Sequence, residues 1–271
     1  MEVTWFDANS WLVAVRGWRV LIDPWLVGDL TFGNLPWLVK GVRPVDVAIP
    51  ENVDLILLSQ GLADHAHPET LRAMDKTIPV VASPDAAKVA IAAGYASVSV
   101  LQHGDEVQRT KEGCAPLSVK ALQGAVVGAM KRENGYVLSV GSSVEDSRSE
   151  AIRLYYEPHG YPDVEQMKSM GDVDVVITPL ADISLLKVAP VVRGGDVAVQ
   201  IAKLLKPQVM MPTAEEGRVS YEGLISGALQ TAGGAEDMRS RLAEAGINTR
   251  VIQPTSGETV DLDLRSSVSA G

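Results

Sequence analysis

The sequence contains a single cysteine, Cys114, among 271 residues. One cysteine excludes a disulfide within the chain and a cysteine-rich zinc site, and it fits a reducing compartment. We therefore expect Cys114 to be a small apolar side chain that is buried or half-buried.

Long apolar runs and clusters of positive charge are also missing. No apolar stretch reaches the roughly 18 to 20 residues of a membrane-spanning helix, so we expect a soluble or peripheral protein. The net charge is −10 and no basic run is interleaved with aromatic residues, which argues against nucleic acid as a partner. No glycine-rich phosphate loop supports an oxidoreductase or a sugar-phosphate binder. The first residues lack the layout of a signal peptide, so a targeting segment is either absent or outside this numbering.

What remains is the composition of a globular protein, 46% hydrophobic and 21% charged, with enough length for a large core. Alternating apolar residues predict an opening β-meander, and the apolar run 53–58 predicts a strand covered on both faces. Strands and helices then alternate through both halves. Strands are predicted at 79–82, 98–101, 118–122, 135–140, 152–156, 173–179 and 208–211, and helices at 68–74, 84–93, 164–170, 196–205 and 234–245. No Gly-, Ser- or Pro-rich linker interrupts this pattern, which predicts one α+β domain over residues 1–265 and a disordered tail at 266–271.

The segment after the predicted core strand carries an Asp-His pair, Asp64-His65, in a loop that precedes a helix. A rigid strand that delivers such a pair into a loop is a layout used to build metal sites. The segment from Ser59 to Leu71 resembles the signature loop of the metallo-β-lactamase superfamily, in which a strand ends in Ser/Thr-His-x-His-x-Asp-His. The opening strands and the Ile22-Asp23-Pro24 turn resemble the branch of L-ascorbate-6-phosphate lactonase-like proteins. This resemblance covers nearly the whole chain and implies a four-layer αββα sandwich.

The resemblance also implies that most metal ligands are lost. Gln60 and Leu62 stand where the family has its first two histidines, and neither replaces an imidazole on zinc. The third histidine of that site is missing after the strand 118–122, and no ligand follows Pro212 at the last position. We expect the first metal site to be empty.

The second site keeps more of its residues. His159 lies on or beside the position of the family's bridging aspartate, and Glu157 is two residues away. Asp64, His65, His159 and Glu157 could hold one zinc, manganese or iron ion, with Asp64 as the catalytic group. Alternatively, Asp64 caps a turn and His65 satisfies buried carbonyls, and no cofactor is bound. We favour this second interpretation. Polar side chains expected in the remaining cleft are Gln60, His67 and His103.

All five tryptophans lie within the first 37 residues, several of them in a segment broken by glycine and proline. Such a segment suits docking to a membrane surface or a membrane protein, or else it folds over the sandwich as a lid. The predicted docking residues are Trp25, Leu26, Phe32, Trp37 and Leu38.

Two functions therefore stay open. The first is a non-catalytic binding or assembly factor, a pseudoenzyme that docks through the Trp-rich segment and accepts a small-molecule ligand in its cleft. The second is a hydrolase of an ester, lactone or phosphoester that uses one metal ion. The variant signature loop and the Tyr155-to-Gly160 stretch resemble plastid and cyanobacterial members of the family, which implies a chloroplast stroma, a thylakoid surface or a cyanobacterial cytoplasm, from a mature form or a bacterial source.

Overall fold

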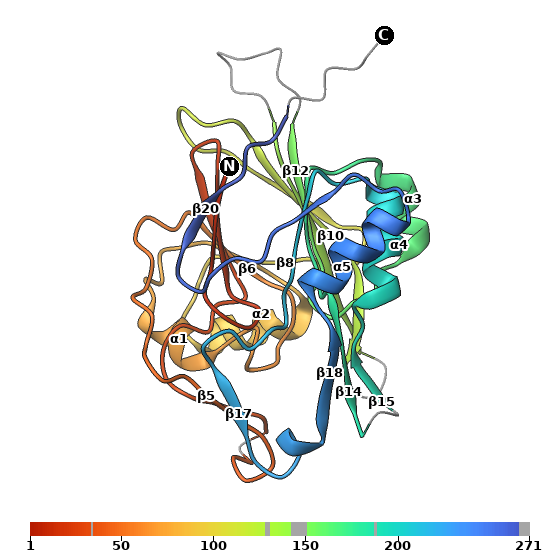
Figure 1. Cartoon of the computed structure of the whole chain (residues 1–271). Helices are drawn as coiled ribbons and strands as arrows, with labels where there is room; N and C mark the ends of the chain where they lie inside the picture. The colour runs from red at the N-terminus through yellow and green to blue at the C-terminus, as the bar shows by residue number, and fades with distance from the viewer. Residues whose placement is uncertain (34, 128–130, 142–150, 187–188, 266–271) are drawn as a thin grey trace.

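Two seven-stranded sheets face each other at the centre of the molecule (Figure 1). The computed structural model describes residues 1–33, 35–127, 131–141, 151–186 and 189–265, and the predicted tail at 266–271 lies outside them. The first sheet has the order β20 (Thr259–Asp261), β1 (Glu2–Trp5), β2 (Trp11–Val15), β3 (Trp18–Ile22), β6 (Leu55–Leu58), β7 (Val80–Ala82) and β8 (Val98–Val100). The second has the order β19 (Arg250–Val251), β16 (Val209–Met211), β13 (Val175–Ile177), β12 (Ile152–Tyr156), β11 (Lys131–Val140), β10 (Leu117–Val127) and β9 (Glu106–Arg109).

Helices cover the outer face of each sheet. On the first sheet lie α1 (Pro68–Ala73) and α2 (Pro84–Ala92), and on the second lie α3 (Val164–Met170), α4 (Gly195–Leu205) and α5 (Ala235–Glu244) (Figure 1). Proline at the first turn and a capping side chain start α1 and α2: the His67 ring accepts from the Thr70 N–H, and the Ser83 hydroxyl accepts from the Ala86 N–H. The predicted α+β sandwich with four layers, αββα, is confirmed.

Strand β6 shows how the layers are joined. All four of its side chains are fully buried, as the apolar run predicted. Leu55 and Leu57 pack into the core between the sheets, whereas Ile56 and Leu58 pack under the helices. A strand buried on both faces needs apolar side chains at every position, which is why this run lacks alternation.

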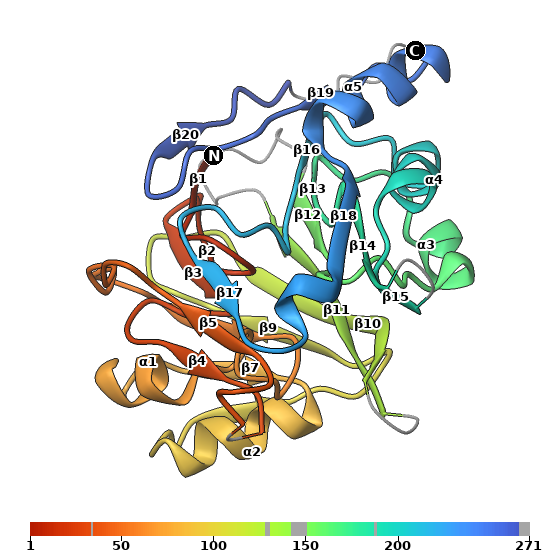
Figure 2. The same ribbon diagram turned by 60° about the horizontal axis from the view of Figure 1, so that its bottom comes forward.

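Two small sheets stand at one end of the sandwich. One joins β15 (Ala189–Val192), β14 (Ala181–Leu185) and β18 (Leu229–Gly233), and the other joins β17 (Ser220–Glu222), β5 (Lys40–Val42) and β4 (Leu30–Thr31). Figure 2 shows β17 beside β5 and β18 beside β14. The segment expected to be an irregular docking loop is therefore partly sheet, held by a strand far along the chain.

The docking prediction is wrong for Trp25 and Leu26, whose side chains are fully buried. The Trp25 indole N–H donates to the Gly28 carbonyl at 2.8 Å, and the Arg43 guanidinium lies 4.9 Å from the centroid of its ring. These contacts keep the indole buried, because its N–H has an acceptor and the face of its ring lies against a cation. Phe32 and Leu38 are half-buried, and Trp37 is 63% exposed. Docking through Trp37 stays a prediction.

Within the described residues, no helix has both the length and the apolar character needed to cross a membrane. Cys114 is a free thiol and half-buried, as expected.

Candidate functional site

Parallel strands bring the site residues to one edge of each sheet. β3 runs parallel to β6, so Asp23 and Ser59, which directly follow these strands, lie at the same edge. β12 and β16 both run parallel to β13 in the second sheet, which places His159 and Thr213 at the corresponding edge. Side chains at the carboxyl ends of neighbouring parallel strands converge, and here two sheets contribute to one site.

Asp23 is the centre of a buried hydrogen-bond network. Its Oδ1 accepts from the Ser59 N–H at 2.7 Å, and its Oδ2 accepts from the Ser59 hydroxyl at 2.5 Å. The same Oδ2 accepts from the Tyr156 hydroxyl at 2.6 Å and lies 2.7 Å from His65 Nδ1. Asp23, Ser59, Tyr156 and His65 are all fully buried. Four donors fix the carboxylate, and the carboxylate in turn fixes the orientation of the His65 ring.

His65 lies between two carboxylates. Its Nε2 is 3.2 Å from Asp64 Oδ2, on the side opposite Asp23. Burial opposes a charged imidazole, but the carboxylates of Asp64 and Asp23 outweigh it and raise the pKa of His65 to about 10. His65 is therefore an imidazolium at neutral pH, with both N–H groups donated to carboxylates.

Asp64 keeps one oxygen free. Its Oδ2 faces His65 and accepts from the Asn9 amide at 3.5 Å, whereas its buried Oδ1 has no hydrogen-bond partner among the described residues. Burial opposes the charge of this carboxylate, but the neighbouring imidazolium overcomes that effect and lowers the pKa of Asp64. The side chain is 14% exposed and lines a cavity.

His159 reaches the same cavity from a loop after β12. The Gln60 amide N–H donates to His159 Nδ1 at 2.9 Å, which leaves the ring proton on Nε2. Burial and the charge of His65, whose ring centroid is 5.0 Å away, lower the pKa of His159 to about 3. His159 is therefore a neutral hydrogen-bond donor at the cavity wall.

Glu157 shapes that loop and does not face the cavity. Its carboxylate accepts from three consecutive backbone N–H groups, those of His159 at 3.2 Å, Gly160 at 2.5 Å and Tyr161 at 3.0 Å. Burial raises the pKa of Glu157 to about 7, against the effect of these donors. The predicted metal ligand is a buried cap of the loop.

We expect Gly160→Ala to disrupt this loop. A Cβ at Gly160 would lie 1.5 Å from the Arg193 carbonyl oxygen, at a φ of +74°. Backbone must move to relieve that contact, so we expect a loss of at least about 3 kcal/mol in the free energy of unfolding, measured by denaturant titration. Gly113→Ala is the matched control, because it has a φ of +69° and nothing within 4 Å of the added Cβ. It should lose only the roughly 1 kcal/mol of a left-handed residue, and equal losses in the two variants would contradict the close contact.

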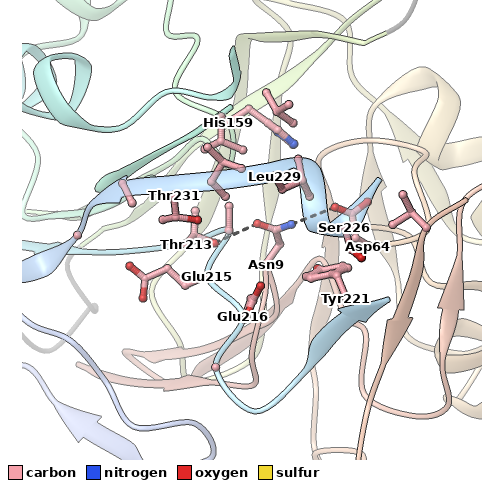
Figure 3. Close-up of a pocket in the computed structure, with 18 of the residues that line it drawn as sticks. Asn9, Asp64, His159, Thr213, Glu215, Glu216, Tyr221, Ser226, Leu229 and Thr231 are labelled. Atoms are coloured by element: carbon pink, nitrogen blue, oxygen red, sulfur yellow. Dashed lines mark hydrogen bonds between the residues drawn. The ribbon is translucent and has the colours of Figure 1, made fainter. Parts of the chain in front are cut away.

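The cavity has a volume of about 490 Å³. It lies between the two small sheets and the edge of the sandwich that carries Asp64 and His159 (Figure 3). Asn9 stands at its floor between Thr213, 3.3 Å from its Oδ1, and Asp64. Apolar side chains from the sheet β15-β14-β18 form one wall, namely Ile183, Val191 and Leu229. The volume is in the range of cavities that enclose small organic molecules.

The predicted metal ligands do not fit a metal ion. Within the described ranges, no group of three or more His, Cys, Asp or Glu side chains could hold one. Both nitrogens of His65 carry protons that are donated to carboxylates, and the Glu157 oxygens face backbone N–H groups. A ligand nitrogen must be deprotonated, so a raised pKa opposes metal binding at His65. Of the four predicted ligands, only Asp64 and His159 line the cavity.

The structure corrects all three of the expected cleft residues. His67 is buried as the cap of α1, with its ring against Trp25, and His103 is exposed in the turn between β8 and β9. Neither is among the described residues that line the cavity. Gln60 is buried behind His159 and supports it from outside the cavity.

Sequence reasoning missed the groups that hold and surround the Asp-His pair. Asp23 was noted only as part of a turn, and Asn9, Tyr156, Glu215 and Tyr221 were not assigned to the site. Asp23 has a recognisable signal, since it follows an apolar strand at a left-handed φ of +43°. Glu215 and Tyr221 carry no local signal, because their place depends on the pairing of β17 with β5.

The chain is similar to hydrolases of known structure. The family model for the β-lactamase superfamily domain matches residues 2–214. The isothiocyanate hydrolase from Delia radicum gut bacteria has a TM-score of 0.64 and 16% identity, and the alignment covers 97% of this chain and 99% of that one. The metallo hydrolase Igni18 from Ignicoccus hospitalis has a TM-score of 0.64 and 14% identity, with the same coverage of 97% and 99%. A possible metal-dependent hydrolase from Veillonella parvula has a TM-score of 0.67 and 14% identity, again covering 97% and 99%. No curated protein matches the chain.

At this identity the solved structures establish a shared fold. The names of these three structures describe hydrolases.

Proposed function

Because this chain belongs to the β-lactamase superfamily, we propose that it is a hydrolase of small esters or lactones that acts in the cavity above Asp64. The observation that carries the proposal is Asp64, whose side chain lines the cavity and whose buried Oδ1 has no hydrogen-bond partner among the described residues. A buried acceptor without a partner is costly, and a water molecule or a substrate N–H or O–H would satisfy it.

The residues suit one reaction step. A water hydrogen-bonded to Asp64 Oδ1 attacks the carbonyl carbon, and its proton passes to that carboxylate as the new C–O bond forms. The neutral His159 donates its Nε2–H to the carbonyl oxygen, where negative charge develops. The C–O bond to the leaving group then breaks, and the leaving oxygen takes the proton from Asp64.

The lowered pKa of Asp64 limits this chemistry. A carboxylate stabilised by an imidazolium is a weak base, so it orients water more than it deprotonates it. We therefore propose activated esters and strained lactones, whose carbonyl carbons are attacked by a poorly activated water.

A second candidate function is binding without catalysis. It is favoured by the ion pairs of His65 with Asp23 and Asp64, because a ring whose two N–H groups are donated to carboxylates cannot act as a base. In that case the same cavity binds a small molecule and releases it without a chemical change. Docking through Trp37 and a photosynthetic cell as the setting, a chloroplast or a cyanobacterium, belong to this candidate as further proposals.

We expect Asp64→Asn to lower the rate of hydrolysis of p-nitrophenyl esters by about 10²-fold or more, because the neutral amide orients the water less strongly and cannot accept its proton. The assay should follow p-nitrophenolate release by purified protein before and after a chelator, with zinc or manganese added back. Asp261→Asn, at a carboxylate on the exposed strand β20, is the control and should leave the rate unchanged.

Three outcomes would overturn the proposal. Hydrolysis that Asp64→Asn leaves intact would place the reaction elsewhere. Hydrolysis that disappears with the chelator and returns with stoichiometric metal would show that the ligands rearrange to hold an ion. Binding of ester analogues with no turnover in either condition would support the non-catalytic candidate.

A further inference from the structure

Carboxylates are the charged side chains that line the cavity. Three carboxylates lie in its lining, Asp64, Glu215 and Glu216, and none of the described lining residues is a lysine or an arginine. Figure 3 shows Glu215 and Asp64 on opposite sides of Asn9. The nearby arginines are used elsewhere: Arg43 Nη1 lies 3.0 Å and Arg218 Nε 3.6 Å from Asp7 Oδ2. His65 is the cation beside Asp64 and is shared with Asp23, whereas no ion pair is found for Glu215 or Glu216 among the described residues. An anionic substrate would therefore meet a net negative charge.

Glu215 is held in place without a cationic partner. Its side chain is half-buried, and the Gln253 amide donates to its Oε2 at 2.9 Å. Its backbone is also fixed, because Glu215 forms a β-bridge with Ala8 and its carbonyl accepts from the Ala8 N–H at 2.9 Å. Burial raises the pKa of this carboxyl, which shows that its surroundings do not compensate its charge. A positively charged group in the cavity would supply that compensation.

The walls favour a ligand with an apolar body. Ile183, Val191 and Leu229 come from the sheet β15-β14-β18, and Phe32 and Val39 come from the segment beside β4 and β5. Small-molecule sites combine such walls with a few placed polar groups, and here the charged ones among them are carboxylates. The arrangement suits a molecule with an aliphatic chain at one end and an ammonium at the other.

We propose that the cavity selects organic cations, so that its substrates are esters or lactones that carry an ammonium group, with Glu215 as the residue that determines this preference. That these molecules are substrates rests on the proposed function, whereas the preference for cations can be tested by binding alone. Glu216, which is exposed at the mouth, and Asp64 at the floor add to the negative potential. Phosphoesters and carboxylates are the disfavoured classes.

The binding experiment compares hexylamine, hexanol and hexanoate by titration calorimetry at low salt. These probes share one chain length and differ in charge. We expect hexylamine to bind at least about ten-fold more tightly than hexanol, the effect of one charge-assisted hydrogen bond, and hexanoate to bind more weakly than either. Glu215→Gln should remove most of the advantage of the amine and leave hexanol binding unchanged.

Glu258→Gln is the matched control, since Glu258 is exposed in the turn before β20 and does not line the cavity. It should leave all three affinities unchanged. Thermal melting of each variant checks that the fold is intact. Equal affinities for the three probes, or an amine preference that Glu215→Gln does not reduce, would overturn the inference.

The kinetic experiment separates this inference from the proposed function. It compares the p-nitrophenyl esters of 6-aminohexanoic acid, hexanoic acid and adipic acid, which are cationic, neutral and anionic. Faster hydrolysis of the cationic ester, reduced by Glu215→Gln through KM, supports both. Tight binding of hexylamine without hydrolysis of any ester would refute the proposed function and leave the cation preference standing. Hydrolysis of all three esters at equal kcat/KM would refute the cation preference and leave the hydrolase standing.

Discussion

Asp23→Asn is expected to lower the free energy of unfolding by about 3 to 5 kcal/mol, the usual effect of removing one partner from a buried charged network. The carboxylate accepts from the Ser59 N–H and hydroxyl, the Tyr156 hydroxyl and His65. An amide has a single acceptor oxygen, so its NH₂ group must face at least one of these donors. The imidazolium of His65 also loses one of its two counter-charges.

Denaturant titration of the natural sequence and of the Asp23→Asn variant measures this loss in the free energy of unfolding. Asp54→Asn is the matched control, because Asp54 also accepts from a backbone N–H, that of Arg19 at 2.8 Å, and also forms an ion pair, with Lys111 at 2.8 Å. Lys111 is 41% exposed, so solvent screens this pair and replaces the lost bonds. We expect a loss of about 1 kcal/mol there. Similar losses at Asp23 and Asp54 would mean that the buried network contributes little to stability.

The protein is expected to lose stability as the pH rises from about 7 to about 9.5, by roughly 3 kcal/mol, since each unit of pKa difference corresponds to about 1.4 kcal/mol. Asp64 and Asp23 raise the pKa of His65, against burial, from 6.5 to about 10. A raised pKa means that the folded state holds the proton more tightly than the unfolded state. The resulting stability is complete below pH 6.5 and is lost as the pH approaches the folded value.

Other shifted groups titrate mainly below this window. Burial raises the pKa of Glu157 from 4.5 to about 7, so the stability it contributes is lost as the pH rises through about 7, and only the end of that loss falls in the window. Burial and His65 lower the pKa of His159 from 6.5 to about 3, and its contribution is lost only as the pH falls below 6.5. The measurement is the free energy of unfolding at intervals across the window, for the natural sequence and for His65→Gln.

The His65→Gln variant should be less stable at neutral pH but should show little of the alkaline slope. If the variant is too unstable to titrate, the imidazole resonances of the natural sequence give the pKa of His65 directly. A flat profile for the natural sequence, or a His65 resonance that titrates near 6.5, would show that the ring is neutral and that Asp64 and Asp23 do not hold a proton there.

The fold followed from the sequence because its signals are local. The run Leu55–Leu58, the Pro68 and Ser83-Pro84 helix starts, and the alternation of the first strands each reflect burial of nearby side chains, and all are found where they were predicted. The site followed only in part. Asp64 and His159 do line one cavity, whereas His67 and His103 do not, because a histidine's type does not reveal whether its ring caps a helix or faces solvent.

The Trp-rich segment was misjudged for a different reason. Glycines and prolines predict an irregular exposed loop, and nothing near Trp25 in the sequence shows that β17 pairs with β5 and that Tyr221 packs 6.5 Å from the Trp25 ring. The same long-range pairing creates the cavity wall. Features that depend on contacts between distant segments need the structure.

The pairing of β5 with β17 makes the cavity depend on segments that are far apart in the sequence. Its lining extends from Asn9, Phe32 and Val39 to Leu229 and Thr231. The family match ends at residue 214, so Glu215, Tyr221 and Leu229 lie beyond the matched residues, whereas Asp23 and His65 lie within them. A molecule bound there contacts both groups of segments, and its affinity reports whether they have come together.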